Sequence, residues 1–240
     1  MKSIKHIMTL LLSLVMILSI IVSSGVITAS AVAGAGLQQT SFRSHGVDIS
    51  FWNVYHYSGD YNEYSWIDFN KMKADGCEFV ILRLGYEASA SRQNTLDDAF
   101  LEYYKRARAA GMPLGLYFYG LSTTKAGAIE DAQWVINVIE SNNMYFEYPI
   151  YYDVEDSAQV ALGASAMEAL CLGWCETLEA AGYFPGVYGG GWSVIDKLSA
   201  NFKSKYDLWY AWYKSMDPNN QFNYNSHDNS DYCGMWQYAA

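Results

Sequence analysis

The sequence has little positive charge. Its 240 residues include 15 lysines and arginines against 25 aspartates and glutamates, which gives a formal net charge of −10. No cluster of basic residues interrupts this acidic character. Proteins that bind nucleic acid offer a basic patch to the phosphates, so the composition argues against nucleic acid as a partner. It also gives no electrostatic reason to bind an anionic surface.

Motifs for nucleotides and metals are also missing. No Gly-x-Gly-x-x-Gly and no phosphate loop follows the first predicted strand, which argues against a nucleotide-binding sheet. The three histidines after the N-terminal segment, His45, His56 and His227, form no pair or triad. The stretch 217–231 holds several oxygen ligands but lacks the glycine of a calcium loop. We therefore expect no metal site and no cofactor.

Cysteine is scarce, with only Cys77, Cys171, Cys175 and Cys233. No histidine stands at metal-ligand spacing from them, so a zinc site is not expected. Cys171 and Cys175 are four residues apart in a predicted helix, where the Cβ vectors do not readily meet disulfide geometry. We expect free, buried thiols, and the sequence leaves a Cys77–Cys233 disulfide open.

The N-terminus has the pattern of a secretory signal peptide. Lys2 and Lys5 precede an apolar run over 7–22, and two small-x-small cleavage sites follow, Ala29-Ser30-Ala31 and Ala31-Val32-Ala33. The alternative is an uncleaved anchor, because the run approaches the length of a membrane span. We assign 1–33 to the signal peptide and 34–44 to a short linker. We expect a secreted monomer that has no stable membrane association after cleavage.

Strands and helices alternate over 45–240, which is long enough for one domain with a full core. The predicted strands are Gly46–Ser50, Cys77–Leu84, Leu114–Tyr119, Tyr148–Val154, Phe184–Tyr188, Tyr206–Trp212 and Gly234–Tyr238. The predicted helices are Tyr64–Asp75, Asp97–Ala110, Lys125–Glu140, Ser165–Ala180 and a short one over Trp192–Leu198, and Ser215–Tyr232 is a loop. Largely apolar strands, each followed by a helix, indicate an α/β fold with parallel strands, and the missing nucleotide motifs favour a barrel over a doubly wound sheet.

Two carboxylates end the fourth of these strands. Asp153 and Glu155 are two residues apart, so on a strand they point to one face, about 6.6 Å apart along the backbone. Asp48 stands at the end of the first strand, and barrels carry their chemistry at the C-terminal ends of strands. Paired carboxylates in different environments are suited to splitting a glycosidic bond. The plainer alternative is that Asp153 caps the next turn and Glu155 is solvated; Asp156 is expected to be a loop or cap residue.

Several motifs, taken in order, resemble those of glycoside hydrolase family 25, the Chalaropsis-type lysozymes. They are Gly46-Val47-Asp48-Ile49-Ser50, Phe79-Val80-Ile81-Leu82-Arg83 with Gly85-Tyr86, Asp97 with Phe100, Ala109-Ala110-Gly111, Gly115-Leu116-Tyr117-Phe118-Tyr119, Asp153-Val154-Glu155, Leu208-Trp209-Tyr210-Ala211 and Trp236-Gln237-Tyr238. The resemblance covers 46–238. It implies a flattened, irregular β/α barrel of the TIM type that cleaves the β-1,4 bond between N-acetylmuramic acid and N-acetylglucosamine in peptidoglycan.

The resemblance also implies roles for the carboxylates in a retaining, substrate-assisted reaction. Glu155 corresponds to the acid/base, Asp153 to the residue that assists the 2-acetamido group of the reacting sugar, and Asp48 to a supporting carboxylate. Elementary chemistry agrees. A general acid needs a raised pKa, which burial and neighbouring negative charge supply, and ionised aspartates stabilise an oxocarbenium-like transition state.

Aromatic residues are plentiful, with 21 tyrosines and 8 tryptophans, which suits a carbohydrate cleft and equally suits core packing. The candidate sugar contacts are Tyr86, Tyr117, Tyr119, Tyr188 and Trp209. Arg83 is a further candidate that orients a carboxylate in the barrel, with a surface salt bridge as its alternative.

The C-terminus departs from the family. The chain ends two residues after Trp236-Gln237-Tyr238, whereas family members continue through a Gly-rich turn into a last strand with another cleft aspartate. The sequence is therefore expected to be an incomplete copy of a longer protein, or else the domain is impaired. Two other functions stay open: a catalytically weakened wall-binding module, and another sugar-active barrel such as a chitin-cleaving enzyme.

Overall fold

The computed structural model describes residues 44–54, 66–89, 91–213 and 233–238. All of them belong to one compact unit, Ala33–Ala240. The predicted signal peptide, most of the linker, His56, His227 and the loop 215–232 lie outside the described residues. Among the helices that are described, none has the length and apolar character needed to cross a membrane.

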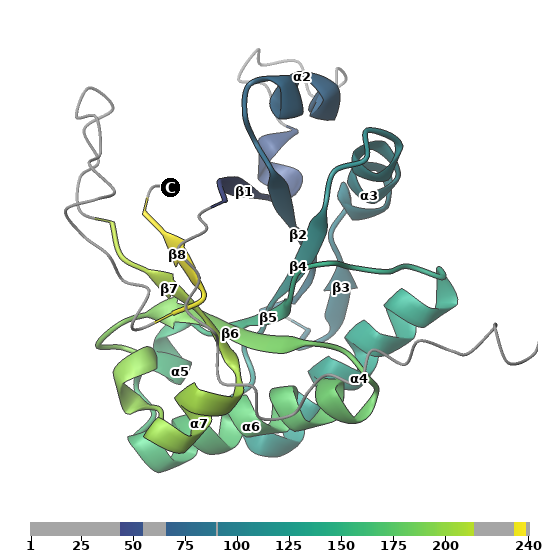
Figure 1. The fold of residues 1–240 in the computed structure, drawn as a ribbon. Coiled ribbons are helices and arrows are strands. Elements are labelled where there is room, and N and C mark those ends of the chain that lie inside the picture. Colours follow the sequence, from purple (N-terminus) through teal and green to yellow (C-terminus); the bar gives the residue numbers. More distant parts are fainter. Residues whose placement is uncertain (1–43, 55–65, 90, 214–232, 239–240) are drawn as a thin grey trace, which may run out of the picture. The chain divides into compact units, whose positions relative to one another are not determined.

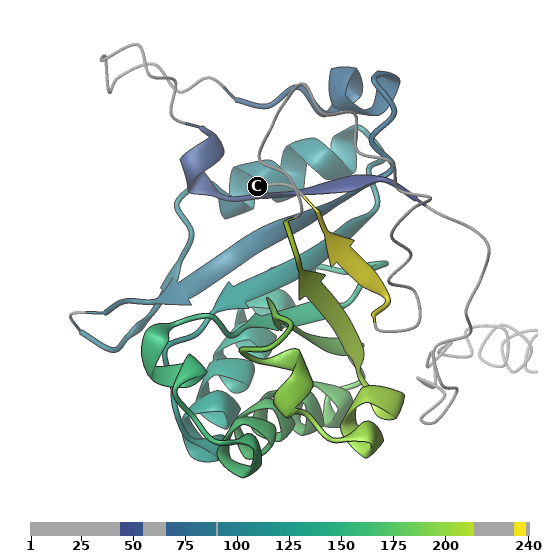
Figure 2. The same cartoon turned by 90° about the vertical axis from the view of Figure 1, so that its left-hand side faces the viewer.

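The described strands form a single eight-stranded sheet (Figure 1). They are β1 Gly46–Ile49, β2 Phe79–Glu87, β3 Asn94–Leu96, β4 Leu114–Tyr119, β5 Ile150–Asp153, β6 Pro185–Gly190, β7 Asp207–Ala211 and β8 Met235–Gln237. Their order is β1-β2-β4-β5-β6-β7-β8, with parallel neighbours, and only β3 runs antiparallel, on β2. The sheet curls until β8 approaches β1 (Figures 1 and 2). The predicted α/β barrel is thereby confirmed.

Helices lie on the outer side of the curl, where α4 and α6 run together beneath the sheet and α3 covers another part (Figure 1). The helical elements are η1 Phe51–Asn53, α2 Phe69–Ala74, α3 Phe100–Ala109, α4 Lys125–Ser141, α5 Ser157–Val160, α6 Ala164–Ala180, η2 Ile195–Lys197 and α7 Ala200–Lys205. The glycines that were expected to end three helices, at 76, 111 and 182, have φ of 100°, 63° and 87°, conformations that side-chain-bearing residues rarely adopt.

Alternate residues of each strand face two different cores. Leu82, Leu116 and Tyr152 pack with helix residues in the outer core. Ile81 and Tyr151, which neighbour them in sequence, belong to a second cluster made of strand residues only, inside the curl. Because both faces are buried, the strands read as nearly continuous apolar runs, and residues two apart share a face.

Some element boundaries differ from the predictions. The helix expected from Tyr64 begins only at Phe69, because Asp68 caps it by accepting from the backbone N–H groups of Asn70 and Lys71. The helix expected from Asp97 begins at Phe100. The short elements β3, α5 and α7 were not predicted. All four cysteines are described; none forms a disulfide, and three of the thiols are buried while Cys77 is half-buried.

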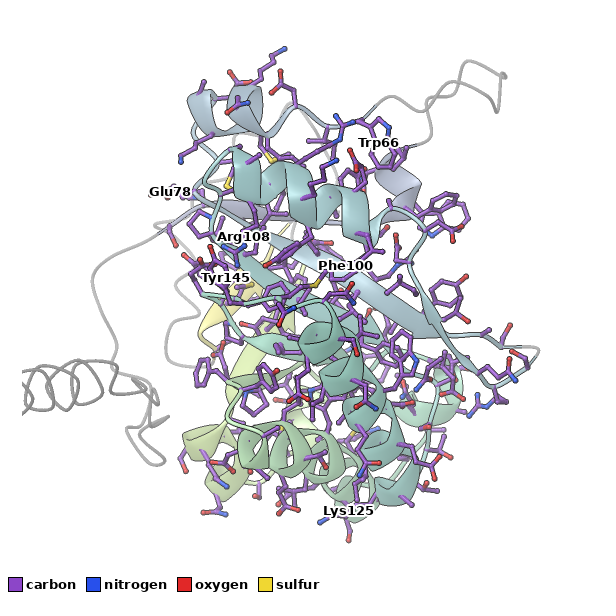
Figure 3. All side chains as sticks on the ribbon, turned by 90° about the vertical axis from the view of Figure 1, so that its right-hand side faces the viewer. Trp66, Glu78, Phe100, Arg108, Lys125 and Tyr145 are labelled. Atoms are coloured by element: carbon purple, nitrogen blue, oxygen red, sulfur yellow. The ribbon has the colours of Figure 1, made fainter. Side chains whose placement is uncertain are left out.

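Arg108, near the C-terminus of α3, ties that helix to the chain that leads into β5 (Figure 3). Its Nη1 lies 2.6 and 2.8 Å from the two carboxylate oxygens of Glu147, and its guanidinium lies 3.9 Å from the ring centroid of Tyr145. Glu147 Oε2 also accepts a 3.0 Å hydrogen bond from the N–H of Leu114, the first residue of β4. These contacts fix the starts of β4 and β5 beside each other.

Candidate active site

The strand β5 carries Asp153 to the C-terminal end of the sheet. Tyr151 and Asp153 point into the curl, while Ile150, Tyr152 and Val154 belong to the outer core. Register aligns Asp153 with Tyr119 of β4 and Tyr188 of β6. Glu155 is the second residue after the end of the strand and is exposed. The sequence Asp-x-Glu thus places one carboxyl inside the mouth of the barrel and the next at its rim.

Asp153 is a buried carboxyl, 5% exposed. Its Oδ1 has no hydrogen-bond partner within the described part of the chain. Burial raises the pKa of Asp153 well above its usual value, the negative charges of Glu155 and Asp48 raise the pKa further, and Arg83 acts in the opposite direction. An orphaned buried acceptor is costly in a folded protein and calls for an explanation.

Asp156, rather than Asp153, caps the turn that follows. Its side chain accepts from the N–H of Ala158 at 2.9 Å, and Gln159 returns the second bond of a capping box. The prediction that Asp156 is a cap residue is confirmed. The alternative in which Asp153 performs that task is wrong.

The surroundings of Glu155 favour its protonated form. Partial desolvation raises its pKa first, and the charge of Asp48 raises it further. Asp48 is the last residue but one of β1, on the opposite side of the mouth, and is half-buried. Burial also raises the pKa of Asp48, while a hydrogen bond from Gln237 lowers it. The structure therefore brings the three predicted carboxyls, Asp48, Asp153 and Glu155, within electrostatic reach of one another.

Arg83 does pair with a carboxylate, but the partner is Asp97. Its Nε lies 2.6 Å from Asp97 Oδ2, and the two side chains are 13% and 0% exposed, so the surface salt bridge considered as an alternative is wrong. Asp97 also accepts from the N–H groups of Phe51 and Ala99. This buried pair joins β2 to the turn after β1 and to the start of α3, and the guanidinium lies 5.3 Å from the ring centroid of Tyr86.

The five candidate aromatics all lie on the inner face or at its end. Register places Tyr86, Tyr119, Asp153, Tyr188 and Trp209 in one row across β2, β4, β5, β6 and β7. Tyr86 and Tyr119 are half-buried, as is Tyr117 two residues before Tyr119. These rings can offer a face to a ligand in the mouth.

Trp209 and Tyr188 are much less accessible, at 3% and 7% exposure. The Trp209 ring lies 4.6 Å from that of Tyr188, 5.2 Å from that of Tyr151 and 6.0 Å from that of Tyr117, measured between centroids. Rings at these separations pack favourably against one another. Trp209 therefore fills the interior beneath the mouth, and little of its surface is left for a ligand.

Two residues at the mouth were not predicted. Gln237 Nε2 donates to Asp48 Oδ2 at 2.8 Å, and Gln237 Oε1 accepts from Tyr188 and Tyr213 at 2.7 and 2.5 Å. Tyr213 is 39% exposed, and the charges of Glu155, Asp48 and Asp153 all raise its pKa, although burial is the larger cause. Tyr213 could have been suggested by its position four residues after Trp209, because residues two or four apart along an extended strand point to the same face.

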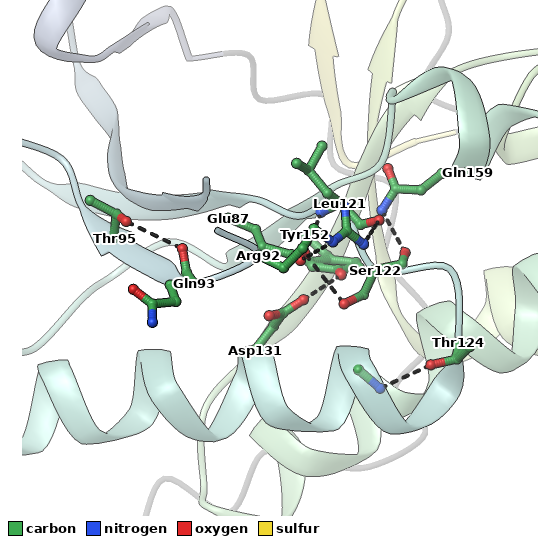
Figure 4. Close-up of polar contacts among 11 residues, drawn as sticks. Glu87, Arg92, Gln93, Thr95, Leu121, Ser122, Thr124, Asp131, Tyr152 and Gln159 are labelled. Atoms are coloured by element: carbon green, nitrogen blue, oxygen red, sulfur yellow. Dashed lines mark hydrogen bonds and ion pairs between the residues drawn. The ribbon is translucent and has the colours of Figure 1, made fainter. Parts of the chain in front are cut away.

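A polar network connects α5 with the ends of β2 and β4 (Figure 4). Gln159, in α5, donates to the carbonyl of Ser122 at 3.0 Å. Glu87 accepts from the N–H of Leu121 at 3.0 Å and forms an ion pair with Arg92 at 2.9 Å. The network joins the ends of β2 and β4 to α5, the helix that begins two residues after Glu155.

Metal ligands do not gather in the part of the chain that is described: no group of three or more His, Cys, Asp or Glu side chains there could hold a metal ion. What the mouth offers instead is carboxyl groups in unequal surroundings, one buried, one half-buried and one at the rim. Such a set can donate a proton, accept one, and stabilise positive charge between them.

Comparison with known proteins gives one family match. The family model described as glycosyl hydrolases family 25 matches residues 51–240. Among curated proteins, none matches the sequence significantly.

Solved structures with the same fold include an autolysin, a muramidase and a family 25 glycosyl hydrolase. The modular autolysin LytC of Streptococcus pneumoniae, in complex with a synthetic peptidoglycan ligand, has a TM-score of 0.54 and 24% identity, over 80% of this chain and 42% of that one. A muramidase of Acremonium alcalophilum has a TM-score of 0.56 and 21% identity, over 82% and 87%. A family 25 glycosyl hydrolase of Bacillus anthracis has a TM-score of 0.56 and 18% identity, over 85% of this chain and 82% of that one. This chain thus spans less than half the length of LytC.

Proposed function

The chain belongs to glycosyl hydrolase family 25, and from this premise we propose that it is a muramidase. It hydrolyses the β-1,4 bond between N-acetylmuramic acid and N-acetylglucosamine in bacterial peptidoglycan, the class of ligand bound by the LytC structure. The observation that carries the proposal is the set of Asp48, Asp153 and Glu155 at the mouth of the barrel. Burial raises the pKa of all three; the charge of Asp48 raises the pKa of Asp153 and Glu155 further, and the charge of Glu155 also raises that of Asp153.

In the first step Glu155 donates its proton to the glycosidic oxygen, and the bond from that oxygen to C1 breaks. Burial and the charge of Asp48 raise the pKa of Glu155, which favours the protonated form that this step requires. Positive charge then develops on the ring oxygen and C1, and the ionised carboxylates of Asp48 and Asp153 stabilise it. Three neighbouring carboxyls cannot all ionise easily, and the proposed mechanism assigns the retained proton to Glu155.

In the second step Asp153 accepts a hydrogen bond from the N–H of the sugar's 2-acetamido group. The unpartnered, buried Oδ1 of Asp153 supports this role, since a ligand N–H would satisfy it. The oriented acetamide oxygen attacks C1 from the opposite face and forms a cyclic intermediate. Glu155, now a carboxylate, takes a proton from a water molecule, and the oxygen of that water attacks C1. The bond from C1 to the acetamide oxygen breaks, which gives the sugar with net retention at C1, and Glu155 has regained its proton.

The half-buried rings of Tyr86, Tyr117 and Tyr119 are the proposed sugar contacts, together with the small exposed parts of Tyr188 and Trp209. Arg83 acts from beneath, through its pairing with Asp97 and its charge near Asp153. We further propose that 1–33 is a signal peptide, 34–44 a linker and 45–240 the catalytic domain, and that the protein acts as a monomer outside the cell, on the wall.

The test is the release of soluble fragments from purified peptidoglycan by the wild type, Glu155→Gln and Glu130→Gln. Glu130 is an exposed residue of α4 and controls for the lost charge. We expect release by the wild type and by Glu130→Gln, with the rate of Glu155→Gln lower by about 10²–10⁴. Binding of peptidoglycan without release would instead favour a wall-binding module, and release from chitin alone would favour the chitin-cleaving alternative.

A further inference from the structure

Gln237 joins the two ends of the curled sheet. It lies on β8, its partner Asp48 lies on β1, and 189 positions separate them in the sequence. In the order of the described strands β1 and β8 are the two outermost and do not pair. The 2.8 Å bond from Gln237 Nε2 to Asp48 Oδ2 therefore joins, through side chains, what no backbone ladder joins.

The orientation of the Gln237 amide is set by its other contacts. Its Oε1 accepts from the hydroxyls of Tyr188 and Tyr213, at 2.7 and 2.5 Å, and these hydroxyls are 3.2 Å apart. An amide has donors on one side and an acceptor on the other, and an ionised carboxylate only accepts. With Oε1 held by two tyrosines, the N–H groups face Asp48. A polar chain thus crosses the mouth from β6, through β8, to β1.

Asp48 has few other sources of stabilisation. The charge of Asp48 raises the pKa of four neighbouring groups, Glu155, Asp153, Tyr117 and Tyr213. Two of these carry negative charge when ionised, and within the described segments no lysine or arginine forms an ion pair with Asp48. The donor from Gln237 is the larger of two contacts that favour the ionised form of Asp48 against burial, and the second is the backbone N–H of Asp48 itself.

We propose that Gln237 is a positioning residue, which fixes Asp48 in the mouth as an ionised carboxylate, while Tyr188 and Tyr213 hold the amide in the orientation that this requires. The inference rests on the proposed function, because an ionised Asp48 matters for hydrolysis by supporting the proton on Glu155 and the positive charge of the reacting sugar. If Gln237 only connected β8 to β1, the hydrogen bond alone would be enough, and the ionisation state of Asp48 would not matter for activity.

The test compares full-length wild type with Gln237→Met, which keeps the side-chain length but has no donor, and with Tyr213→Phe, which removes one hydroxyl that orients the amide. The exposed Gln133 of α4 provides the matched control, Gln133→Met. Titration of the Asp48 carboxyl is followed by carbon-13 NMR, with the signal assigned through Asp48→Asn. The pH dependence of kcat/KM on peptidoglycan is measured alongside.

In Gln237→Met we expect the Asp48 midpoint to rise by about one pH unit, as for the loss of one hydrogen bond to a charged group. The acidic limb of kcat/KM should move with it, and kcat should fall about tenfold while KM changes little. Tyr213→Phe should move the midpoint in the same direction by less, and Gln133→Met should not move it.

An Asp48 midpoint that is unmoved in a folded Gln237→Met protein overturns the inference, even if the melting temperature drops. If Gln237→Met does not fold, an unmoved midpoint in Tyr213→Phe overturns it. The NMR measurement needs no activity, so the two proposals fail separately. A shifted midpoint in a protein that releases nothing from peptidoglycan rejects the muramidase and keeps the positioning role.

Discussion

The hydroxyl of Tyr152 donates a 2.7 Å hydrogen bond to Asp131, so β5 is tied to α4 directly behind Asp153. Both side chains are buried, at 0% and 3% exposure. Tyr152 also stacks on Trp174, with ring centroids 4.7 Å apart. The residue that precedes Asp153 is thus anchored to the helical layer by its ring and by its hydroxyl.

Replacing Tyr152 with Phe should destabilise the protein although it keeps the ring. The change removes the hydroxyl that donates to the buried carboxyl of Asp131, and the loss of such a bond costs about 1–3 kcal/mol. Urea denaturation of Tyr152→Phe beside Tyr183→Phe, a half-buried tyrosine, measures the difference in the free energy of unfolding. Equal values for the two variants would show that the Tyr152–Asp131 bond contributes nothing net.

Asp48→Asn should move the basic limb of the pH profile to lower pH. A general acid works only while it is protonated, so activity falls as pH rises through the pKa of Glu155, which partial burial and the charge of Asp48 raise. Removing that charge lowers this pKa, and we expect a shift of about 0.5–1 unit in kcat/KM. The control is Asp196→Asn, at an exposed position. A basic limb that stays in place, or moves upward, would contradict the assignment of Glu155.

Asp207 should make the protein less stable as pH rises. It is buried, it accepts a 2.5 Å bond from the Tyr151 hydroxyl, and burial raises its pKa from 3.8 to about 6. The folded state therefore holds this proton more tightly than the unfolded state. The contribution is most favourable below pH 4 and is lost as pH rises through about 6.

Asp207→Asn removes this titration. Relative to the wild type it should gain roughly 2–4 kcal/mol at pH 7 compared with pH 4, because one pKa unit corresponds to about 1.36 kcal/mol. Unfolding free energies of both proteins at these two pH values give the comparison. The same pH dependence in wild type and variant would show that Asp207 does not titrate in this range.

Alanine variants of Trp209 and Tyr213 should differ in their effects, because Trp209 packs in the interior and Tyr213 can contact substrate. Trp209→Ala empties a site that three tyrosine rings surround, and should cost about 3–5 kcal/mol of stability. Tyr213→Ala removes a ring that is 39% exposed beside the carboxyls, so we expect a raised KM with a smaller loss of stability. Melting curves and kinetics on peptidoglycan distinguish them, and the reverse pattern would make Trp209 the sugar platform.

Long, strongly patterned elements could be predicted from the sequence. The strand Leu114–Tyr119 was predicted with the bounds that the structure has, and α4 differs by one residue. In these segments the apolar pattern and the buried faces agree. By contrast, β3 has three residues and depends on pairing with β2, and α5 has a single turn. Such elements form through contacts that a local pattern does not contain.

The site could be predicted in part for the same reason. Asp48, Asp153 and Glu155 stand at strand ends, and parallel strands bring their C-terminal ends to one edge. Gln237 could not be recognised, because its role depends on a curl that brings β8 to β1. Whether Arg83 faces a catalytic carboxylate or Asp97 also depended on side-chain geometry, and the irregularity in β2 between Arg83 and Gly85 is invisible in the residue pattern.

The most direct test of the muramidase assignment is the identity of the new reducing ends. Peptidoglycan digested by the protein is reduced with borohydride, and the soluble fragments are analysed by mass spectrometry. The account predicts fragments that end in reduced N-acetylmuramic acid, formed by the wild type and nearly absent with Glu155→Gln. Fragments that end in reduced N-acetylglucosamine, or equal product from Glu155→Gln, would contradict it.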